Sequence, residues 1–261
     1  MVLYKNLHKT SHQDVIAIGR VREDAMGYDK HQATEEFTRW SKSYDRSILQ
    51  RLLFGPSHRA ILGRIRGRFG SNRLNLLDIG CGTGVFADRM RQELPAARIW
   101  GIDLVPGMLQ KGADRWARHA GVVQPVQGDS ERLPFAAGQF DVVTCSNSFH
   151  HYPNQDKAVA EMRRVLKPGG CLLLVDGYRD APWGWLIYDV CVASVEGNVH
   201  HCSRNRLREL CDLAGFETVS QKIHRGAAPF LLTEAVTPAT LMIPTPHIGV
   251  EKARTQHARS A

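Results

Sequence analysis

The sequence has no long apolar run and no leader-like beginning. Its longest purely apolar stretch, Cys171–Val175, falls far short of the roughly 20 residues that a transmembrane helix needs. Met1–Lys9 contains neither the apolar stretch nor the small-residue cleavage site of a secretory signal. We therefore expect a protein without a membrane span that works in the cytoplasm.

Cysteines at metal-binding spacing are also missing. The six cysteines form no Cys-x-x-Cys pair, and three of them lie in apolar, strand-like runs where a reduced thiol acts as a small hydrophobic side chain. They are Cys81, Cys145, Cys171, Cys191, Cys202 and Cys211. This usage indicates neither a disulfide framework nor a zinc site, and we predict no metal.

No RNA-binding appendage or base-reading motif accompanies the net charge of +8. The densest basic cluster consists of Arg59, Arg64, Arg66, Arg68 and Arg73. These arginines recur at helical spacing beside Ile61, Leu62, Ile65 and Phe69, which is typical of an amphipathic surface helix with a solvated basic face. The pattern favours a small-molecule partner over nucleic acid.

From Leu74 onward, short apolar runs alternate with longer amphipathic ones, which predicts a parallel sheet with crossover helices. The predicted strands are 74–79, 98–103, 125–129, 140–147 and 171–176, followed by 216–223 and 230–236. The predicted helices are 85–94, 106–119, 155–166 and 203–214. We expect one α/β domain over residues 35–236, after a weakly ordered extension (1–34) and before a disordered, proline-interrupted tail (237–261).

A glycine-rich turn follows the first predicted strand. Asp78 precedes Gly80, Gly82 and Gly84, and glycines here let the backbone approach a ligand closely. A bare strand-to-helix turn would explain two glycines but not three at alternate positions. The dinucleotide fingerprint G-x-G-x-x-G would need a glycine where Val85 stands, and Asp78 would repel a pyrophosphate. The loop therefore favours a ligand without phosphates and disfavours a dehydrogenase.

Acids also end the next two predicted strands. Asp103 is placed to accept both hydroxyls of a ribose, and Asp129 to accept a hydrogen bond from an adenine amine that Leu104 and Met108 sandwich. Either acid alone could be a helix cap. Together with the glycine loop at three successive strand ends they indicate a nucleoside site, because open α/β sheets bind ligands at those ends.

This ordered series of motifs resembles the class I S-adenosylmethionine-dependent methyltransferases, and within them the small-molecule branch that includes the ubiquinone and menaquinone C-methyltransferases. The matching segments are Leu76–Gly84, Gly101–Asp103, Gly128–Phe135, Phe140–Val143 and Val165–Gly170. The likeness covers residues from about 35 to 176. It implies S-adenosylmethionine as cofactor and a Rossmann-like seven-stranded, mostly parallel sheet with helices on both faces and an antiparallel last strand.

The resemblance also implies which residues hold the cofactor. The residue matching Ser146 binds the methionine amine through its backbone carbonyl, and Tyr44 matches a tyrosine that covers the methionine end, although an ordinary core aromatic would explain it equally well. The expected cofactor-binding set is Tyr44, Asp78, Gly80, Cys81, Gly82, Gly84, Asp103, Leu104, Met108, Asp129, Ser130 and Ser146.

The acceptor end is less determined. His150 and His151 follow the fourth predicted strand and are candidate general bases, with His151 preferred, although such a turn can equally serve packing. The Asn/Asp-Pro-Pro-aromatic motif of base-amino methyltransferases is absent here. Gly177–His201, with Trp183 and Trp185, is a candidate substrate lid that would suit an apolar ring or lipid-like acceptor.

We therefore expect an enzyme that methylates an oxygen, carbon or nitrogen of a small, partly apolar metabolite. The alternative is an RNA-associated methyltransferase or a cofactor-binding module without catalysis. Neither the accepting atom nor the oligomeric state follows from the sequence.

Overall fold

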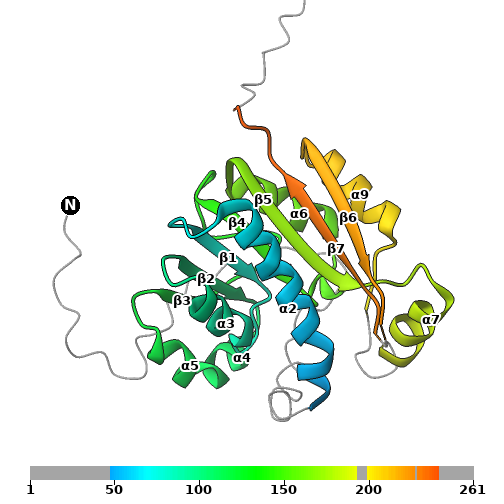
Figure 1. Cartoon of the computed structure of the whole chain (residues 1–261), viewed down its shortest axis with the longest axis horizontal. Helices are drawn as coiled ribbons and strands as arrows, with labels where there is room; N and C mark the ends of the chain where they lie inside the picture. The colour runs from blue at the N-terminus through cyan, green and yellow to red at the C-terminus, as the bar shows by residue number, and fades with distance from the viewer. Residues whose placement is uncertain (1–47, 193–198, 227, 241–261) are drawn as a thin grey trace, which may run out of the picture.

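The computed structural model describes residues 48–192, 199–226 and 228–240, with side chains from residue 54 onward. Their central feature is a seven-stranded sheet in the order β3-β2-β1-β4-β5-β7-β6 (Figure 1). The strands are β1 (Asn75–Ile79), β2 (Arg98–Asp103), β3 (Val123–Gln127), β4 (Phe140–Ser146), β5 (Leu166–Gly177), β6 (Thr218–His224) and β7 (Phe230–Val236). Only β7 runs antiparallel to its neighbours, β5 and β6. The predicted fold class is confirmed.

Helices connect the strands on both faces of the sheet. They are α2 (Ile48–Phe69), α3 (Val85–Glu93), α4 (Pro106–Lys111), α5 (Ala113–Arg118), α6 (Gln155–Val165), α7 (Pro182–Trp185) and α9 (Arg204–Leu213), with the short turns η1 (Phe149–His151) and η2 (Leu186–Val192). The single helix predicted over 106–119 is wrong, because the chain breaks it at Gly112. A Cβ at this glycine would lie 2.5 Å from the Thr83 carbonyl oxygen, so close packing against the glycine loop requires a glycine here. Glycine has a low helix propensity, and the helix is interrupted at this position.

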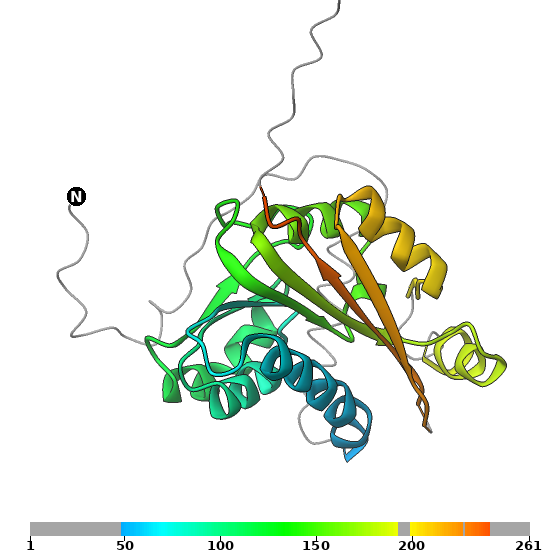
Figure 2. The same ribbon diagram turned by 45° about the horizontal axis from the view of Figure 1, so that its top comes forward.

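Neighbouring residues of each strand face opposite cores. Leu76 packs with the core that includes α2 and α3, whereas Leu77 packs with the core that includes α6 and α9. Figures 1 and 2 show α2 and α9 on opposite faces of the sheet. Both leucines are fully buried, and each such burial contributes about 1.5–3 kcal/mol to stability. The two cores hold the strand ends in fixed positions.

The predicted amphipathic character of the basic helix is confirmed in α2. Ile61, Leu62 and Ile65 are fully buried. On the outer face, Arg66 pairs with Glu93 at 2.6 Å. Acids of the chain therefore meet part of the basic face, as expected for a solvated helix surface.

The predicted start of the tail is wrong by at least two residues. Thr237 is fully buried, and its hydroxyl donates to the Lys167 carbonyl at 2.6 Å. The Pro238 carbonyl accepts from the Gly169 N–H at 3.0 Å. Both residues therefore belong to the fold. Their polar groups find backbone partners at the irregular start of β5, which a composition-based boundary could not anticipate.

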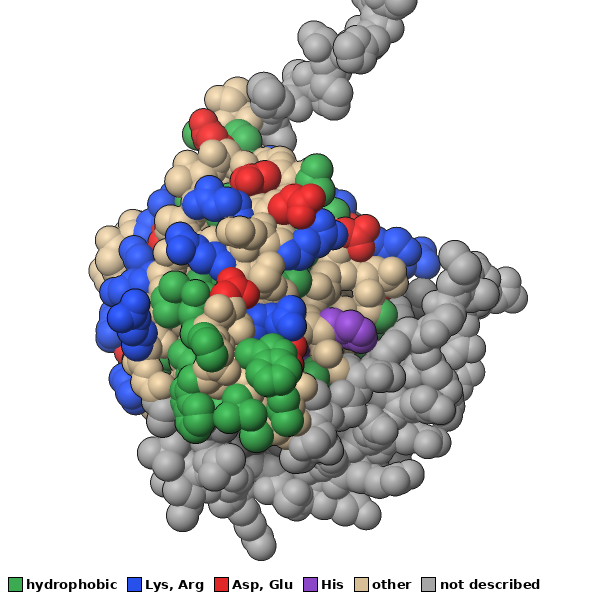
Figure 3. Space-filling view, turned by 90° about the vertical axis from the view of Figure 1, so that its right-hand side faces the viewer, with side chains coloured by type: hydrophobic (Ala, Val, Ile, Leu, Met, Phe, Trp, Pro, Cys, Tyr) green, Lys and Arg blue, Asp and Glu red, His purple; other side chains and the backbone are tan. Residues whose placement is uncertain are grey.

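The candidate lid is helical over residues 182–192. This helical part carries an apolar surface patch, which we define as Trp183, Trp185, Leu186 and Val190. Figure 3 shows hydrophobic side chains gathered on this side of the molecule. No described helix combines the length and the apolar character that a membrane crossing requires.

Candidate active site at the carboxyl ends of the strands

The glycine loop between β1 and α3 uses its three glycines in two ways. Gly80, Gly82 and Gly84 all have positive φ angles, at 70°, 55° and 78°. A Cβ on Gly80 would lie 2.3 Å from Ser148 Oγ, and one on Gly84 would lie 2.2 Å from the Trp116 ring. A Cβ on Gly82 would meet nothing within 4 Å. Two glycines thus allow packing inside the fold, and the third leaves an open face for a ligand.

Asp103 at the end of β2 fixes this loop. Its Oδ2 accepts from the Gly82 N–H at 2.7 Å, and its Oδ1 accepts from the Val105 N–H at 2.9 Å. Burial raises the pKa of Asp103, although these two N–H donors counteract the rise. Because a carboxylate offers about four lone-pair sites, two acceptor positions are left for other donors. Ribose hydroxyls would suit them.

Asp78 at the end of β1 is a buried acid without a cationic partner among the described residues. Its Oδ1 accepts from Thr144 Oγ1 at 2.8 Å. Burial raises the pKa of Asp78 to about 7, the Thr144 hydrogen bond opposes the rise, and the charge of Asp103 adds to it. Two acids side by side favour a ligand with positive charge here and disfavour a phosphate.

The third acid, Asp129, follows β3 and shapes a tight turn. Its Oδ1 accepts from the Glu131 N–H at 2.9 Å, and its carbonyl accepts from the Arg132 N–H at 3.1 Å. Ser130 is half-buried within the same turn. The structure therefore places the acids of β1, β2 and β3 at one end of the sheet, and their roles toward a ligand stay predictions.

The other predicted cofactor residues divide by burial. Leu104 is exposed at the end of β2, whereas Met108 on α4 and Cys81 in the loop are buried. Ser146 at the end of β4 is half-buried, and its hydroxyl accepts from Asn147 Nδ2 at 3.0 Å. Tyr44 lies outside the described residues.

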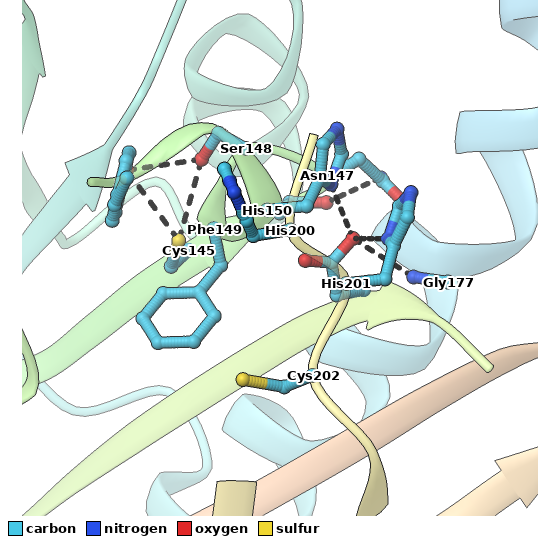
Figure 4. Close-up of polar contacts among 12 residues, drawn as sticks. Cys145, Asn147, Ser148, Phe149, His150, Gly177, His200, His201 and Cys202 are labelled. Atoms are coloured by element: carbon cyan, nitrogen blue, oxygen red, sulfur yellow. Dashed lines mark hydrogen bonds and ion pairs between the residues drawn. The ribbon is translucent and has the colours of Figure 1, made fainter. Parts of the chain in front are cut away.

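At the ends of β4 and β5 the chain brings two histidines to one carboxylate (Figure 4). His150 Nδ1 lies 2.6 Å from Asp176 Oδ1, and His201 Nδ1 lies 3.6 Å from the same oxygen. The Gly177 N–H donates to this oxygen at 2.8 Å. Burial alone would raise the pKa of Asp176, but the two histidines lower it well below its usual range. We call His150, Asp176 and His201 the buried triad.

His151, the preferred candidate base, lies beside this triad rather than in it. Its ring centroid is 4.1 Å from that of His150 and its side chain is half-buried, so it is the more accessible of the two. Sequence reasoning missed Asp176 and His201 as site residues. The available signal was an acid directly after the buried fifth strand, at the same end of the sheet as Asp78 and Asp103.

Comparison with known proteins agrees with this geometry. Residues 76–170, from β1 into β5, match the family model described as a methyltransferase domain. Over 150 residues the chain is 33% identical to demethylmenaquinone methyltransferase of Deinococcus radiodurans, covering 57% of this chain and 61% of the relative. It is also 33% identical to the ubiquinone/menaquinone biosynthesis C-methyltransferase UbiE of Cupriavidus metallidurans, covering 59% of this chain and 66% of the relative.

Over the matched residues the chain is similar to S-adenosylmethionine-dependent methyltransferases of the ubiquinone/menaquinone C-methyltransferase kind.

Solved structures of this methyltransferase class share the fold. Magnesium protoporphyrin IX methyltransferase (ChlM) from Synechocystis PCC 6803, solved with bound SAH, aligns with a TM-score of 0.65 at 16% identity, covering 80% of this chain and all (100%) of that one. A possible histamine N-methyltransferase from Thermotoga maritima aligns with a TM-score of 0.61 at 21% identity, covering 78% and 99%. At such identities the likeness concerns the fold alone.

The methyltransferase match also has a limited extent. The chain spans 61% and 66% of the lengths of the two curated relatives. The acceptors of these relatives therefore do not transfer directly to this chain.

Proposed function

We propose that this methyltransferase transfers a methyl group from S-adenosylmethionine to a carbon, oxygen or nitrogen of a small, partly apolar metabolite. The observation that carries the proposal is the Asp-x-Gly-x-Gly-x-Gly loop, clamped by Asp103 and open at Gly82. The two quinone-pathway relatives, one of them named as a C-methyltransferase, make a quinol-like ring carbon the first acceptor to test.

The residues at the ends of β1, β2 and β3 suit the parts of this cofactor. Asp103 would accept the ribose hydroxyls, Asp129 the adenine amine, and Asp78 would attract the cationic methionine end. When bound, the cofactor supplies a methyl group on a positively charged sulfur. Holding the acceptor in line with that methyl and excluding water accounts for several kcal/mol of barrier lowering.

The described part of the lid supports an apolar acceptor. The Tyr188 ring packs against Gly177, where a Cβ would lie 2.6 Å from the ring. The same ring centroid lies 5.1 Å from that of His201. Aromatic surface is therefore present directly at the end of β5, beside the buried triad.

His151 is the residue that we assign to remove a proton from the acceptor where the chemistry requires it. It lies on η1, immediately after β4, and is the more accessible of the two adjacent histidines. A hydroxyl or an activated ring carbon loses a proton when it is methylated, and an imidazole can take it near neutral pH.

A turnover screen with labelled S-adenosylmethionine tests the acceptor class. We expect turnover with a quinol or phenol and none with random RNA. Turnover confined to RNA would overturn the small-molecule assignment. Failure of the methyl donor to bind at all would overturn the methyltransferase proposal itself.

A calorimetric titration with S-adenosylmethionine tests the cofactor site. Asp103→Ala should weaken binding by about 1.5–3 kcal/mol, roughly ten- to a hundredfold, because charged acceptors are lost and the loop loses its clamp. Asp212→Ala, an exposed aspartate on α9, is the matched control and should bind like the wild type. Equal affinity in the two variants would remove Asp103 from the site.

A further inference from the structure

The buried triad joins three separate parts of the chain in one closed place. His150 comes from η1, Asp176 from β5, and His201 from the segment before α9. Their side chains are only 7%, 8% and 1% exposed, respectively. Among the described residues, this is the one group of three side chains that could together bind a metal ion.

Hydrogen bonds within the described chain do not account for this cluster. Neither ring nitrogen of His201 has a hydrogen-bond partner there, and neither does Asp176 Oδ2. The contacts from His150, His201 and the Gly177 N–H all converge on the other carboxylate oxygen, Oδ1. A neutral imidazole needs one donor and one acceptor partner, so burial of His201 without either is unfavourable unless another group occupies the space.

The two imidazole rings lie beside each other, with ring centroids 4.3 Å apart. A divalent cation accepts lone pairs from both imidazoles and from the carboxylate at once.

We propose that His150, Asp176 and His201 bind a divalent transition-metal ion of the Zn²⁺ type. One ligand atom from each residue can be chosen so that all lie within 4.8 Å of one another, and an ion at about 2.0–2.2 Å from each would draw them slightly together. Two imidazoles select a borderline-soft ion over Mg²⁺ or Ca²⁺, which prefer oxygen ligands.

The surroundings are suited to orient these ligands. The Gly177 N–H donates to the carboxylate at 2.8 Å, as outer partners of metal ligands commonly do. The backbone N–H of His200 donates to the His150 carbonyl at 2.7 Å, which holds the His201 segment against η1. The ion would tie this segment to the ends of β4 and β5. The ligands lie 26 and 25 positions apart in the chain, so the cysteine spacing that argued against a metal had no bearing on them.

A Co²⁺ titration of the tag-free, metal-stripped chain tests the site. Absorption in the visible range reports coordination, and elemental mass spectrometry reports the Zn²⁺ that remains after dialysis. We expect one equivalent of tightly bound metal in the wild type and a loss of affinity of at least about a hundredfold in His201→Ala and Asp176→Asn. The absence of stoichiometric binding would overturn the proposal.

His119→Ala is the matched control. His119 Nε2 lies 2.5 Å from Asp88 Oδ1, so the variant removes a histidine–aspartate pair that has no second imidazole. It should bind metal like the wild type. Equal loss in His119→Ala and His201→Ala would show adventitious binding and overturn the proposal.

A measurement on the wild type alone keeps the test decisive if a triad variant fails to fold. X-ray absorption of the Zn²⁺-loaded chain should show two imidazole ligands and oxygen, with no sulfur. A sulfur ligand would place the ion at a cysteine instead, and would overturn the assignment to the triad. None of these readouts depends on methyl transfer.

Discussion

Two buried aspartates, at the ends of β1 and β5, have opposite electrostatic environments. Asp78 receives one hydroxyl donor from Thr144, and burial raises its pKa to about 7. Asp176 has two imidazoles within reach, which lower its pKa despite its burial. The end of β1 thus presents an acid without a cationic partner among the described residues, whereas the end of β5 brings two imidazoles to its acid.

The two ends also differ in what builds them. The loop of the cofactor end is shaped by backbone conformation and by N–H groups that Asp103 fixes, so it is preorganised for a ligand that many enzymes share. The buried triad of the acceptor end depends on side chains from three distant segments. This difference teaches that the glycine loop is encoded locally, whereas the buried triad is encoded by tertiary packing.

Among the variants that test this comparison, Gly84→Ala should have the largest effect on stability. The new Cβ would lie 2.2 Å from the Trp116 ring, at a residue with φ 78°. Overpacking and left-handed strain together should lower the free energy of unfolding by about 3 kcal/mol or more. Urea denaturation measures this loss directly.

Gly82→Ala sharpens the same prediction because its Cβ would meet no protein atom within 4 Å. We expect a stability loss of about 1 kcal/mol from the positive φ alone, but a clear loss of S-adenosylmethionine affinity. Gly138→Ala, at φ 66° and equally open, is the control for strain without a ligand. If Gly82→Ala and Gly138→Ala bind the cofactor alike, the open face of the loop does not contact it.

At the acceptor end, His151→Ala tests whether the chain supplies a base. If His151 removes the proton, turnover should fall by about a hundredfold while the cofactor Kd stays near the wild-type value, because proton transfer matters only in the transition state. Single-turnover kinetics and calorimetry measure the two quantities. A loss seen only in stability or in the acceptor KM would show that His151 packs, and near-normal turnover would leave catalysis to proximity and orientation.

The sequence predicted the position of the glycine loop and of the acids at the strand ends well for a physical reason. Gly80, Gly82 and Gly84 are close in the chain, and the acids at the ends of β1, β2 and β3 follow from strand periodicity, so local pattern and parallel-sheet geometry suffice. The start of the tail at Thr237 was wrong because backbone partners at the irregular start of β5 decide it.

The buried triad could not be predicted in the same way. No local pattern relates His201 to Asp176, and their encounter depends on how the segment before α9 returns to the sheet. The break at Gly112 has a similar origin, because contact with the glycine loop, not helix propensity, selects the residue. Such features come from contacts between segments that are distant in sequence.

The last expected effect concerns pH and Asp78, which has no cationic partner among the described residues. Asp78 has a folded-state pKa of about 7, against an ordinary value of 3.8. Between these values the folded chain holds a proton that the unfolded chain has lost, so this group's stabilising contribution falls as pH rises through the window, by at most about 1.4 kcal/mol per pH unit. Asp78→Asn does not titrate and should lack that slope.

Cofactor binding should have the opposite pH dependence at the same group. If the cationic methionine end of S-adenosylmethionine lies near Asp78, it favours the ionised carboxylate, and binding must displace the proton below pH 7. The affinity of the wild type should therefore fall as the pH is lowered from 7.5 to 5.5, by up to about tenfold per pH unit. Calorimetry of the wild type and Asp78→Asn at each pH isolates this contribution, because the two proteins differ only at this carboxyl group. Parallel pH profiles would show that Asp78 accepts the Thr144 hydrogen bond but does not interact with the charge of the cofactor. The difference between Asp78 and Asp176 would then arise from packing and not from the charge of a ligand.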